Sequence, residues 1–158
     1  MEIEVREVNG KADLKKFIHL PEKIHRGHSN WVPPIYLDDH VYFNPEKNKS
    51  FSYCDTILML ACRDSVPVGR IMGLIVKPYN EIHHEQHARF AWMECENDPA
   101  VFNALMKSVE SWARKKGMTH LVGPLAFSDK DPQGFLVEGY HETVVIASNC
   151  NYPYMVEL

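Results

Sequence analysis

The residues best suited to chemistry lie in the stretch ECENDPAVF, residues 94–102, just ahead of an amphipathic segment. Glu94, Glu96 and Asp98 place three carboxylates within five residues, and the next basic residue is Lys107. A helix N-terminus offers free backbone N–H groups and the positive end of the helix dipole, and both favour a bound anion. The first question is therefore whether this helix start holds a phosphate or is simply capped.

Four features of the stretch favour a capped helix. It contains no glycine that would let an anion approach the backbone closely, Pro99 lacks an N–H donor, and Asp98 is a natural N-cap whose carboxylate would occupy the remaining donors. The fourth feature is repulsion. A helix terminus stabilises an anion by roughly 0.3–1 kcal/mol, whereas one carboxylate about 4 Å from a phosphate costs about 4 kcal/mol near a protein surface. The pattern predicts no phosphate site of the usual kind.

The segment that follows reads as a helix. Its apolar residues recur at the spacing of one helical face: Val101, Phe102, Leu105, Met106, Val109, Trp112 and Ala113. Pro99 suits the first helical position, and Gly117 suits the left-handed cap at the other end.

The other elements follow from apolar periodicity and from Gly and Pro breaks. We expect a strand over residues 2–8, a helix over 11–27, a loop-rich segment over 28–51, a hairpin of strands 56–62 and 66–76, strands over 88–95 and 119–127, a short helix or turn over 131–140, a last strand over 143–148, and a helix beginning within 151–158. This order predicts a single α+β domain with a mixed, largely antiparallel sheet and helices on both faces.

Composition narrows the class of protein. The 158 residues carry a net charge of −4, with 45% hydrophobic and 24% charged residues, which is typical of a globular domain and does not favour nucleic-acid binding. No apolar run approaches the roughly 18 residues of a membrane span. The cysteines, Cys54, Cys62, Cys95 and Cys150, form no C-x-x-C pair, so we expect free thiols in a cytoplasmic protein.

The histidine-rich stretch EIHHEQH, residues 81–87, is the one pattern that resembles a metal motif. His84 and His87 miss the H-E-x-x-H spacing of zinc proteases by one residue. We expect a solvated connection there and no metal site.

Two stretches carry a resemblance to a known family. ILMLACRDSVPVGRIMGLIV, residues 57–76, resembles the second and third strands of the GNAT superfamily of acyl-CoA N-acyltransferases, and ALMKSVESWARKKGMTHLVGPL, residues 104–125, resembles its third helix and fifth strand. Over its whole length the chain also resembles the N-terminal part of longer, uncharacterised bacterial GNAT-like proteins, in which NWVPP and NPEKN have counterparts. The resemblance implies a GNAT-like fold and an N-terminal portion of a longer protein.

The resemblance also implies a cofactor, acetyl-CoA or another acyl-CoA. In the family, a glycine-rich loop between the fourth strand and third helix cradles the cofactor's pyrophosphate, and residues 94–102 depart from that loop. By position, Cys95, Asn97, Phe127 and Ser128 would border the cofactor. Because of the departure, we expect cofactor binding by this chain alone to be weak or absent.

Family positions suggest the remaining site residues. Glu94 or Glu96, at the end of the fourth strand, would act as the general base, and Tyr140 would act as the general acid near the leaving thiolate. Trp31 and Tyr36, in the aromatic loop, would contact the acceptor. Each has a plainer role open to it: Tyr140 and the loop aromatics in packing, Ser128 as a helix cap, and Cys95 as a buried thiol.

Two functions follow from these observations. The first is an N-acyltransferase that acts on a small-molecule or peptide amine. The second is a degenerate, non-catalytic GNAT-like module that binds another domain, because its pyrophosphate loop is absent. In either case the partner could be a missing C-terminal domain or a second copy of the chain.

Overall fold

The predicted hairpin forms the middle of a five-stranded sheet in the computed structural model, which describes residues 2–146 and 148–158. The strands follow chain order across the sheet: β1 (Ile3–Glu7), β2 (Cys54–Arg63), β3 (Val66–Val76), β4 (His87–Cys95) and β5 (His120–Val122). The first four are antiparallel neighbours, and β5 pairs with β4 in parallel. The mixed, largely antiparallel sheet is therefore confirmed.

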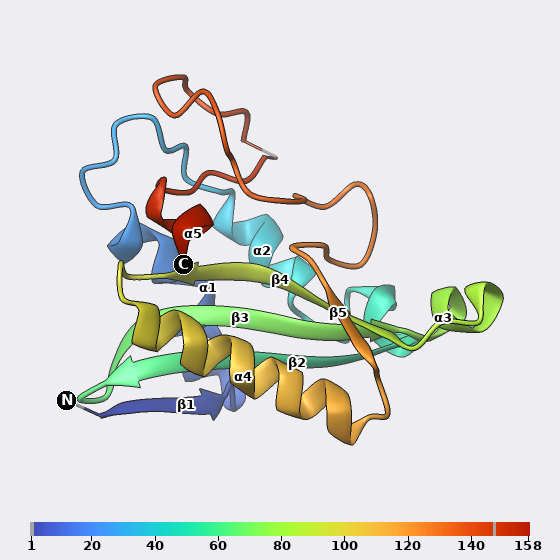
Figure 1. Ribbon diagram of the computed structural model, residues 1–158. Coiled ribbons are helices and arrows are strands. Elements are labelled where there is room, and N and C mark those ends of the chain that lie inside the picture. Colours follow the sequence, from blue (N-terminus) through green and yellow to red (C-terminus); the bar gives the residue numbers. More distant parts are fainter. Residues whose placement is uncertain (1, 147) are drawn as a thin grey trace.

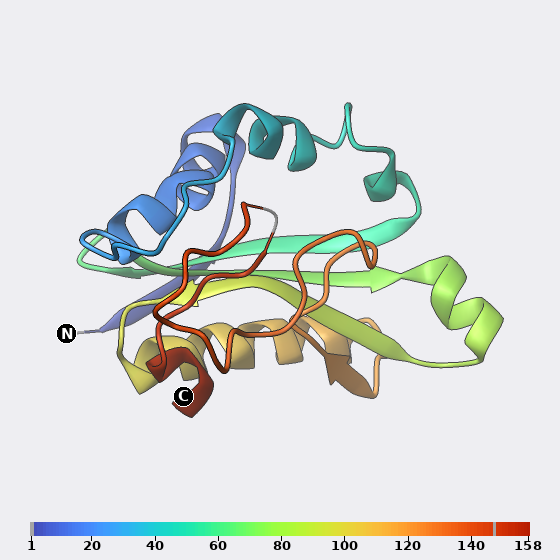
Figure 2. The same cartoon turned by 90° about the horizontal axis from the view of Figure 1, so that it is seen from above.

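Helices cover both faces of this sheet, as predicted. α1 (Gly10–Ile24) and α2 (Tyr36–Tyr42) lie on one face, and α4 (Pro99–Lys115) lies on the other (Figures 1 and 2). The short α3 (Lys77–His83) follows β3, a 3-10 turn spans Lys49–Ser52, and α5 (Tyr154–Glu157) lies near the end of the chain. The layers place one apolar core under α1 and another under α4.

Strand β3 contributes side chains to both cores. Met72 and Leu74 belong to the core under α1, whereas Ile71 belongs to the core under α4, as the two-residue period of a strand requires. Gly69 and Gly73 let α4 pack closely. A Cβ at Gly69 would lie 2.8 Å from Leu105, and one at Gly73 would lie 3.1 Å from Val109. Neither position has room for a larger side chain unless a neighbour shifts.

The boundaries of α4 match the sequence pattern. Asp98 is the N-cap, and its side chain accepts a hydrogen bond from the Ala100 N–H at 2.9 Å. The buried face consists of Val101, Leu105, Val109 and Ala113. Gly117 has a φ of +80° and follows the last turn, as expected for a helix ending in the left-handed region.

Several predictions for the second half of the chain are wrong. β5 ends at Val122 rather than at residue 127. Of the two alternatives for residues 131–140, a short helix or a turn, the structure has turns and irregular backbone. Residues 143–146 and 148 are not a strand, and residue 147 lies outside the described residues. An apolar run becomes a strand only where a neighbouring strand can take its hydrogen bonds. The described backbone of this run lies outside the sheet.

Two predicted loops contain helices. The segment expected to be irregular over residues 28–51 includes α2, and α3 occupies the beginning of the histidine-rich connection. Both helices have seven residues and bury no residue fully, so their periodic signal is weak. The helix expected within residues 151–158 is present as α5. In the described part of the chain, none of the helices has both the length and the apolar character to cross a membrane.

Candidate functional site

A pocket of about 300 Å³ lies between the α1–α2 segment, β4 and the segment that follows β5. In Figure 1 that last segment, coloured orange to red, passes beyond β4 on the side of the α1–α2 connection. Apolar side chains form most of the pocket wall: Trp31, Val32, Pro34, Ile35, Trp92, Phe135 and Ile146. Four charged residues also line it: Asp38, Asp39, Arg70 and Glu94.

An irregularity in β4 positions Glu94 on this side of the sheet. Arg70 of β3 pairs with Glu94, but Met72 pairs with Ala91, so β4 has one extra residue between the two pairs. Trp92 within this bulge has a φ of +52°, and both Ala91 and Trp92 pack against the core under α1. A bulge shifts the alternation of all later side chains. Without it, Glu94 would point towards α4.

The buried charges of the pocket form a connected group. Arg70 Nη2 lies 2.7 Å from Glu94 Oε2 in an ion pair, and the two side chains are 4% and 17% exposed. His25 Nε2 lies 3.3 Å from Glu94 Oε1. Arg70 Nη1 also donates to the Phe17 carbonyl at 2.8 Å. One carboxylate is therefore held between a guanidinium and an imidazole.

Electrostatics keep this carboxylate ionised. Burial opposes ionisation of Glu94, but the Arg70 charge and the His25 contact outweigh it, so the pKa of Glu94 lies below its usual value. The pKa of Asp39, another acid of the pocket, shifts in the opposite direction. Burial raises the pKa of Asp39, and the positive charge of Arg70 offsets only part of that effect. Glu94 is the stronger candidate for a permanent negative charge in the pocket.

The start of α4 is filled by the protein's own side chains. Arg63 Nη2 lies 2.5 Å from Asp98 Oδ2, and Arg63 Nη1 lies 3.1 Å from Glu96 Oε2. Lys23 Nζ contacts Glu96 Oε1 at 2.7 Å. The Asp98 side chain also caps the helix at the Ala100 N–H, and the Val101 and Phe102 N–H groups donate to the Asp98 backbone carbonyl. The first turn of α4 and the two cations beside it are thus in contact with groups of the chain itself.

The structure brings together two of the predicted site residues. Glu94 and Trp31 both line the pocket. Trp31 stacks on the His25 ring, with centroids 5.1 Å apart and planes 10° apart. Glu96 lies in the ion pairs at the start of α4, and Asn97 is exposed beside it. Neither is among the pocket-lining residues.

The other predicted site residues are distributed around the fold. Cys95 is buried in the core under α4, and Tyr36 stacks on His19 at 4.3 Å. The Tyr140 hydroxyl donates to the Leu136 carbonyl at 2.7 Å. Phe127 and Ser128 line a separate pocket together with Tyr42 and Lys47. Ser128 also forms a local turn, in which its Oγ accepts from the Lys130 N–H at 3.2 Å.

Sequence reasoning missed several members of the site. Arg70 had a usable signal, because a charged residue within an apolar strand needs a buried partner. His25 and Asp39 carried no such signal, since each stands in an ordinary amphipathic context. Their part in the site depends on how α1 and α2 dock on the sheet.

Comparison with known sequences finds longer proteins that this chain matches over part of their length. No family model matches the chain. It is 34% identical over 140 residues to the Bacterial ceramide synthase of Caulobacter vibrioides, covering 88% of this chain and 36% of that protein. It is 28% identical over 136 residues to Protein YghO of Escherichia coli, covering 86% of this chain and 35% of that protein. The chain thus spans about a third of the length of these relatives.

Comparison with solved structures identifies the fold. A tandem GNAT protein from the clavulanic acid biosynthesis pathway aligns with a TM-score of 0.57 and 16% identity, over 76% of this chain and 35% of that one. The aminoglycoside acetyltransferase AAC(6')-Iy, solved with a CoA bisubstrate analogue, aligns with a TM-score of 0.53 and 15% identity, over 80% and 81%. The chain has the fold of the GNAT superfamily.

Proposed function

We propose that this chain forms the acceptor side of an N-acyltransferase whose acceptor is a long-chain amine. The observation that carries the proposal is an ionised carboxylate, Glu94, in a pocket whose walls are mostly apolar. An alkyl chain gains stability from apolar walls, and an ammonium group gains it from a desolvated carboxylate. This combination suits an amphiphilic amine better than a polar one.

The chemistry assigned to Glu94 is proton acceptance. An amine must lose a proton before or during attack on a thioester carbonyl. The nitrogen–carbon bond then forms, the carbon–sulfur bond breaks, and the departing thiolate takes up the second proton that the nitrogen loses. Because Glu94 is ionised, it can hold the ammonium and accept that proton directly or through one water. Arg70 makes Glu94 a weaker base, while His25 fixes its orientation.

The Caulobacter relative supports the choice of acceptor. A ceramide is an N-acylated long-chain amino alcohol, so the name of the Caulobacter relative describes the acylation of such an amine. Two residues of the pocket wall suit an alkyl chain that enters from solvent: Ile35 is 54% exposed and Ile146 is 49% exposed. The acceptor's tail would cover them.

The acyl donor would be held elsewhere in a longer protein. The start of α4 is occupied by Asp98 and its ion pairs, which argues against acyl-CoA phosphates at that position. We therefore propose that the chain is the N-terminal portion of a longer GNAT-like protein and that another part binds the acyl-CoA. The tandem GNAT protein gives a precedent for two such units in one chain.

Fluorescence titration tests the acceptor site, because Trp31 and Trp92 line the pocket. The probe is sphinganine, kept below its aggregation concentration, and the matched control ligand is a long-chain alcohol without the amine. We expect a saturable change with sphinganine that is at least about tenfold weaker with the alcohol, since a charge-assisted contact contributes about 1.5–3 kcal/mol.

Two variants sharpen this test. Glu94→Gln keeps the shape of the side chain and should reduce sphinganine affinity to that of the alcohol. Asp38→Asn, at an exposed acid of the same pocket, should change affinity little. Equal binding of the two ligands to the unaltered chain would refute the proposed acceptor, as would undiminished binding by folded Glu94→Gln.

A non-catalytic GNAT-like module is the second candidate, favoured by the capped and ion-paired start of α4. Calorimetric titration of acetyl-CoA against the chain separates the two candidates in part. Saturable micromolar binding would exclude the degenerate module, and it would also contradict the proposal that another part of the protein holds the acyl-CoA. A folded chain that binds neither acetyl-CoA nor sphinganine would favour it. Replacing Asp98 and Pro99 with glycine should create acetyl-CoA affinity only if the rest of the fold can hold the cofactor.

A further inference from the structure

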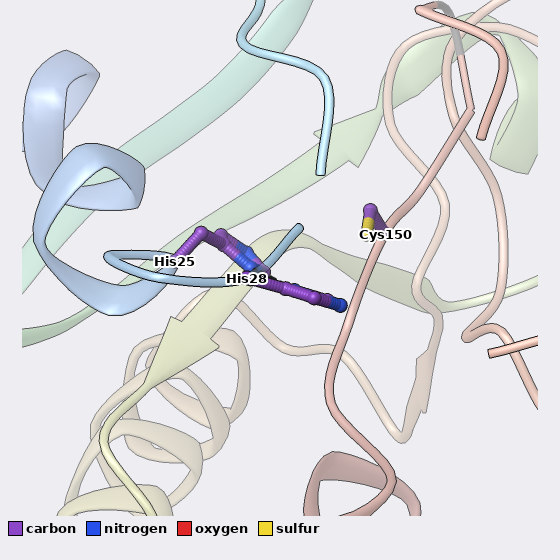
Figure 3. Close-up of side chains that lie close together, drawn as sticks. All are labelled: His25, His28 and Cys150. Atoms are coloured by element: carbon purple, nitrogen blue, oxygen red, sulfur yellow. Dashed lines mark hydrogen bonds between the residues drawn. The ribbon is translucent and has the colours of Figure 1, made fainter. Parts of the chain in front are cut away.

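Three potential metal ligands meet beside the pocket, from opposite ends of the chain. His25 and His28 follow α1, and Cys150 lies in the segment before α5 (Figure 3). Their donor atoms all lie within 4.8 Å of one another. The sequence pattern did not indicate this cluster. Of its three residues, only His25 has a role in the proposed acyl transfer.

The local backbone holds the two imidazoles together. The His28 N–H donates to the His25 carbonyl at 2.9 Å, which closes a turn. The two Nδ1 atoms lie 2.9 Å apart, and the His25 ring is buried. Tyr152 stacks on the His28 ring at 4.2 Å and so fixes the C-terminal segment two residues from Cys150.

Glu94 orients the buried imidazole for metal binding. Its carboxylate is 3.3 Å from His25 Nε2, so that nitrogen donates the proton of the contact. In the neutral ring, His25 Nδ1 then has a lone pair, and it faces His28 Nδ1 at 2.9 Å. Histidines that bind metals commonly have this carboxylate partner on the opposite ring nitrogen. The contact between Glu94 and His25 is separate from the close spacing of the three donor atoms, and it too indicates that His25 is a metal ligand.

The spacing suits a tetrahedral ion. With Zn–N about 2.0–2.1 Å and Zn–S about 2.3 Å, ligand atoms around one zinc lie about 3.3–3.6 Å apart. One ring nitrogen of each histidine and Cys150 Sγ lie within 4.8 Å of one another, and the two Nδ1 atoms are 2.9 Å apart, so side-chain rotations can bring the three donors to zinc distances. Two imidazoles and a thiolate select zinc-like transition ions over Mg²⁺ or Ca²⁺.

We propose that His25 Nδ1, His28 Nδ1 and Cys150 Sγ bind one Zn²⁺-class ion and so tie the C-terminal segment to the end of α1. Three protein ligands leave a fourth position for water or a ligand. Cys150 and Glu94 line the pocket, so the ion would border it. This inference does not depend on the acyl-transfer proposal.

Cobalt substitution tests the site on the intact chain. After treatment with a chelator, the protein is titrated with Co²⁺, whose bond to a thiolate gives a charge-transfer absorption band. We expect a band that saturates at one Co²⁺ per chain and disappears on addition of Zn²⁺. Cys150→Ser should abolish the band. His28→Ala should weaken binding at least about tenfold, because even the loss of a partner outside the ligand set costs 10–100-fold.

His141→Ala is the matched control, because His141 is exposed and is not part of the cluster. It should leave the titration unchanged. Zn²⁺ should also raise the Tm of the parent chain and of His141→Ala, but not of Cys150→Ser, because only a bound ion stabilises the folded state. Absence of the band in folded protein would overturn the proposal. Survival of the band in Cys150→Ser, or equal loss in His141→Ala, would do the same.

Discussion

Arg70 Nη2 and Glu94 Oε2 lie 2.7 Å apart on neighbouring strands, beside the apolar core under α1. Arg70 is on the α1 face together with Met72 of the same strand, and the bulge at Trp92 in β4 places Glu94 on that face as well. A buried charge needs its partner, since removing one member leaves the other unpaired in a desolvated environment. The pair is therefore a structural requirement of the fold as well as the polar part of the pocket.

Arg70→Met should lower the free energy of unfolding by about 3–5 kcal/mol, because it leaves Glu94 unpaired. Urea denaturation measures the loss. Arg114→Met is the matched control, since Arg114 forms an exposed pair with Glu110 and such pairs contribute about 0.3–0.5 kcal/mol. Combining Arg70→Met with Glu94→Leu should recover part of the loss. Equal effects of the two single variants would contradict the prediction.

Gly69→Ala should destabilise the chain by about 1–3 kcal/mol through overpacking. The new Cβ would lie 2.8 Å from Leu105 Cδ1 and 2.9 Å from both Cys95 Cβ and Val101 Cγ1, so α4 would have to move away from β3. Chemical denaturation gives the change. A variant within about 0.5 kcal/mol of the parent would show that α4 adjusts freely.

Asp98→Ala should cost about 0.5–2 kcal/mol, because the first turn of α4 loses its cap. Asp98→Asn separates the cap from the charge: the amide oxygen can still accept from the Ala100 N–H, while the ion pair with Arg63 is lost. We expect the Asn variant to lie closer to the parent in thermal unfolding. The reverse order would mean that the ion pair, and not the cap, dominates.

Asp13 should titrate far below an ordinary aspartate. Its hydrogen bonds with Arg6 lower the pKa of Asp13 to about 2 from 3.8. Because the folded-state pKa is the lower one, its stabilising effect is complete above about pH 4 and is lost as the pH falls towards 2. Carbon-detected NMR titration of the carboxyl measures this. Arg6→Gln should return the midpoint towards 3.8, and a parent midpoint already at that value would refute the assignment.

Cys95 should be unreactive in the folded chain. Burial raises the pKa of its thiol to about 12, and the thiolate is the reactive form. Alkylation at pH 8 followed by peptide mapping should leave Cys95 unmodified in buffer and modified in urea. Modification of Cys95 in buffer at the rate seen in urea would show that β4 and α4 separate readily.

Elements with strong local periodicity were predictable. The α4 helix has an apolar face, a cap and a terminal glycine within its own sequence, and the hairpin of β2 and β3 has two long apolar runs around a short turn. By contrast, residues 143–146 have an apolar composition but no strand structure. Strand formation needs a partner that composition does not specify.

The candidate site was predictable only in part. Glu94 and Trp31 were identified from family positions, and both line the pocket. Asp98 was identified as the cap that replaces a phosphate cradle, and it has that contact. The histidines after α1 and Cys150 were not identified, because they are far apart in the chain and belong to no known spacing motif.

The sequence by itself determined the place of the β2–β3 hairpin, the bounds and buried face of α4, and the fact that the start of α4 is acidic and capped. These properties depend on residues a few positions apart, within reach of helical or strand periodicity. Only the tertiary structure decided that Glu94 faces Arg70 and His25, which are 24 and 69 positions away. That arrangement depends on one extra residue in β4, on the β3–β4 register and on the docking of α1, none of which is encoded in local periodicity.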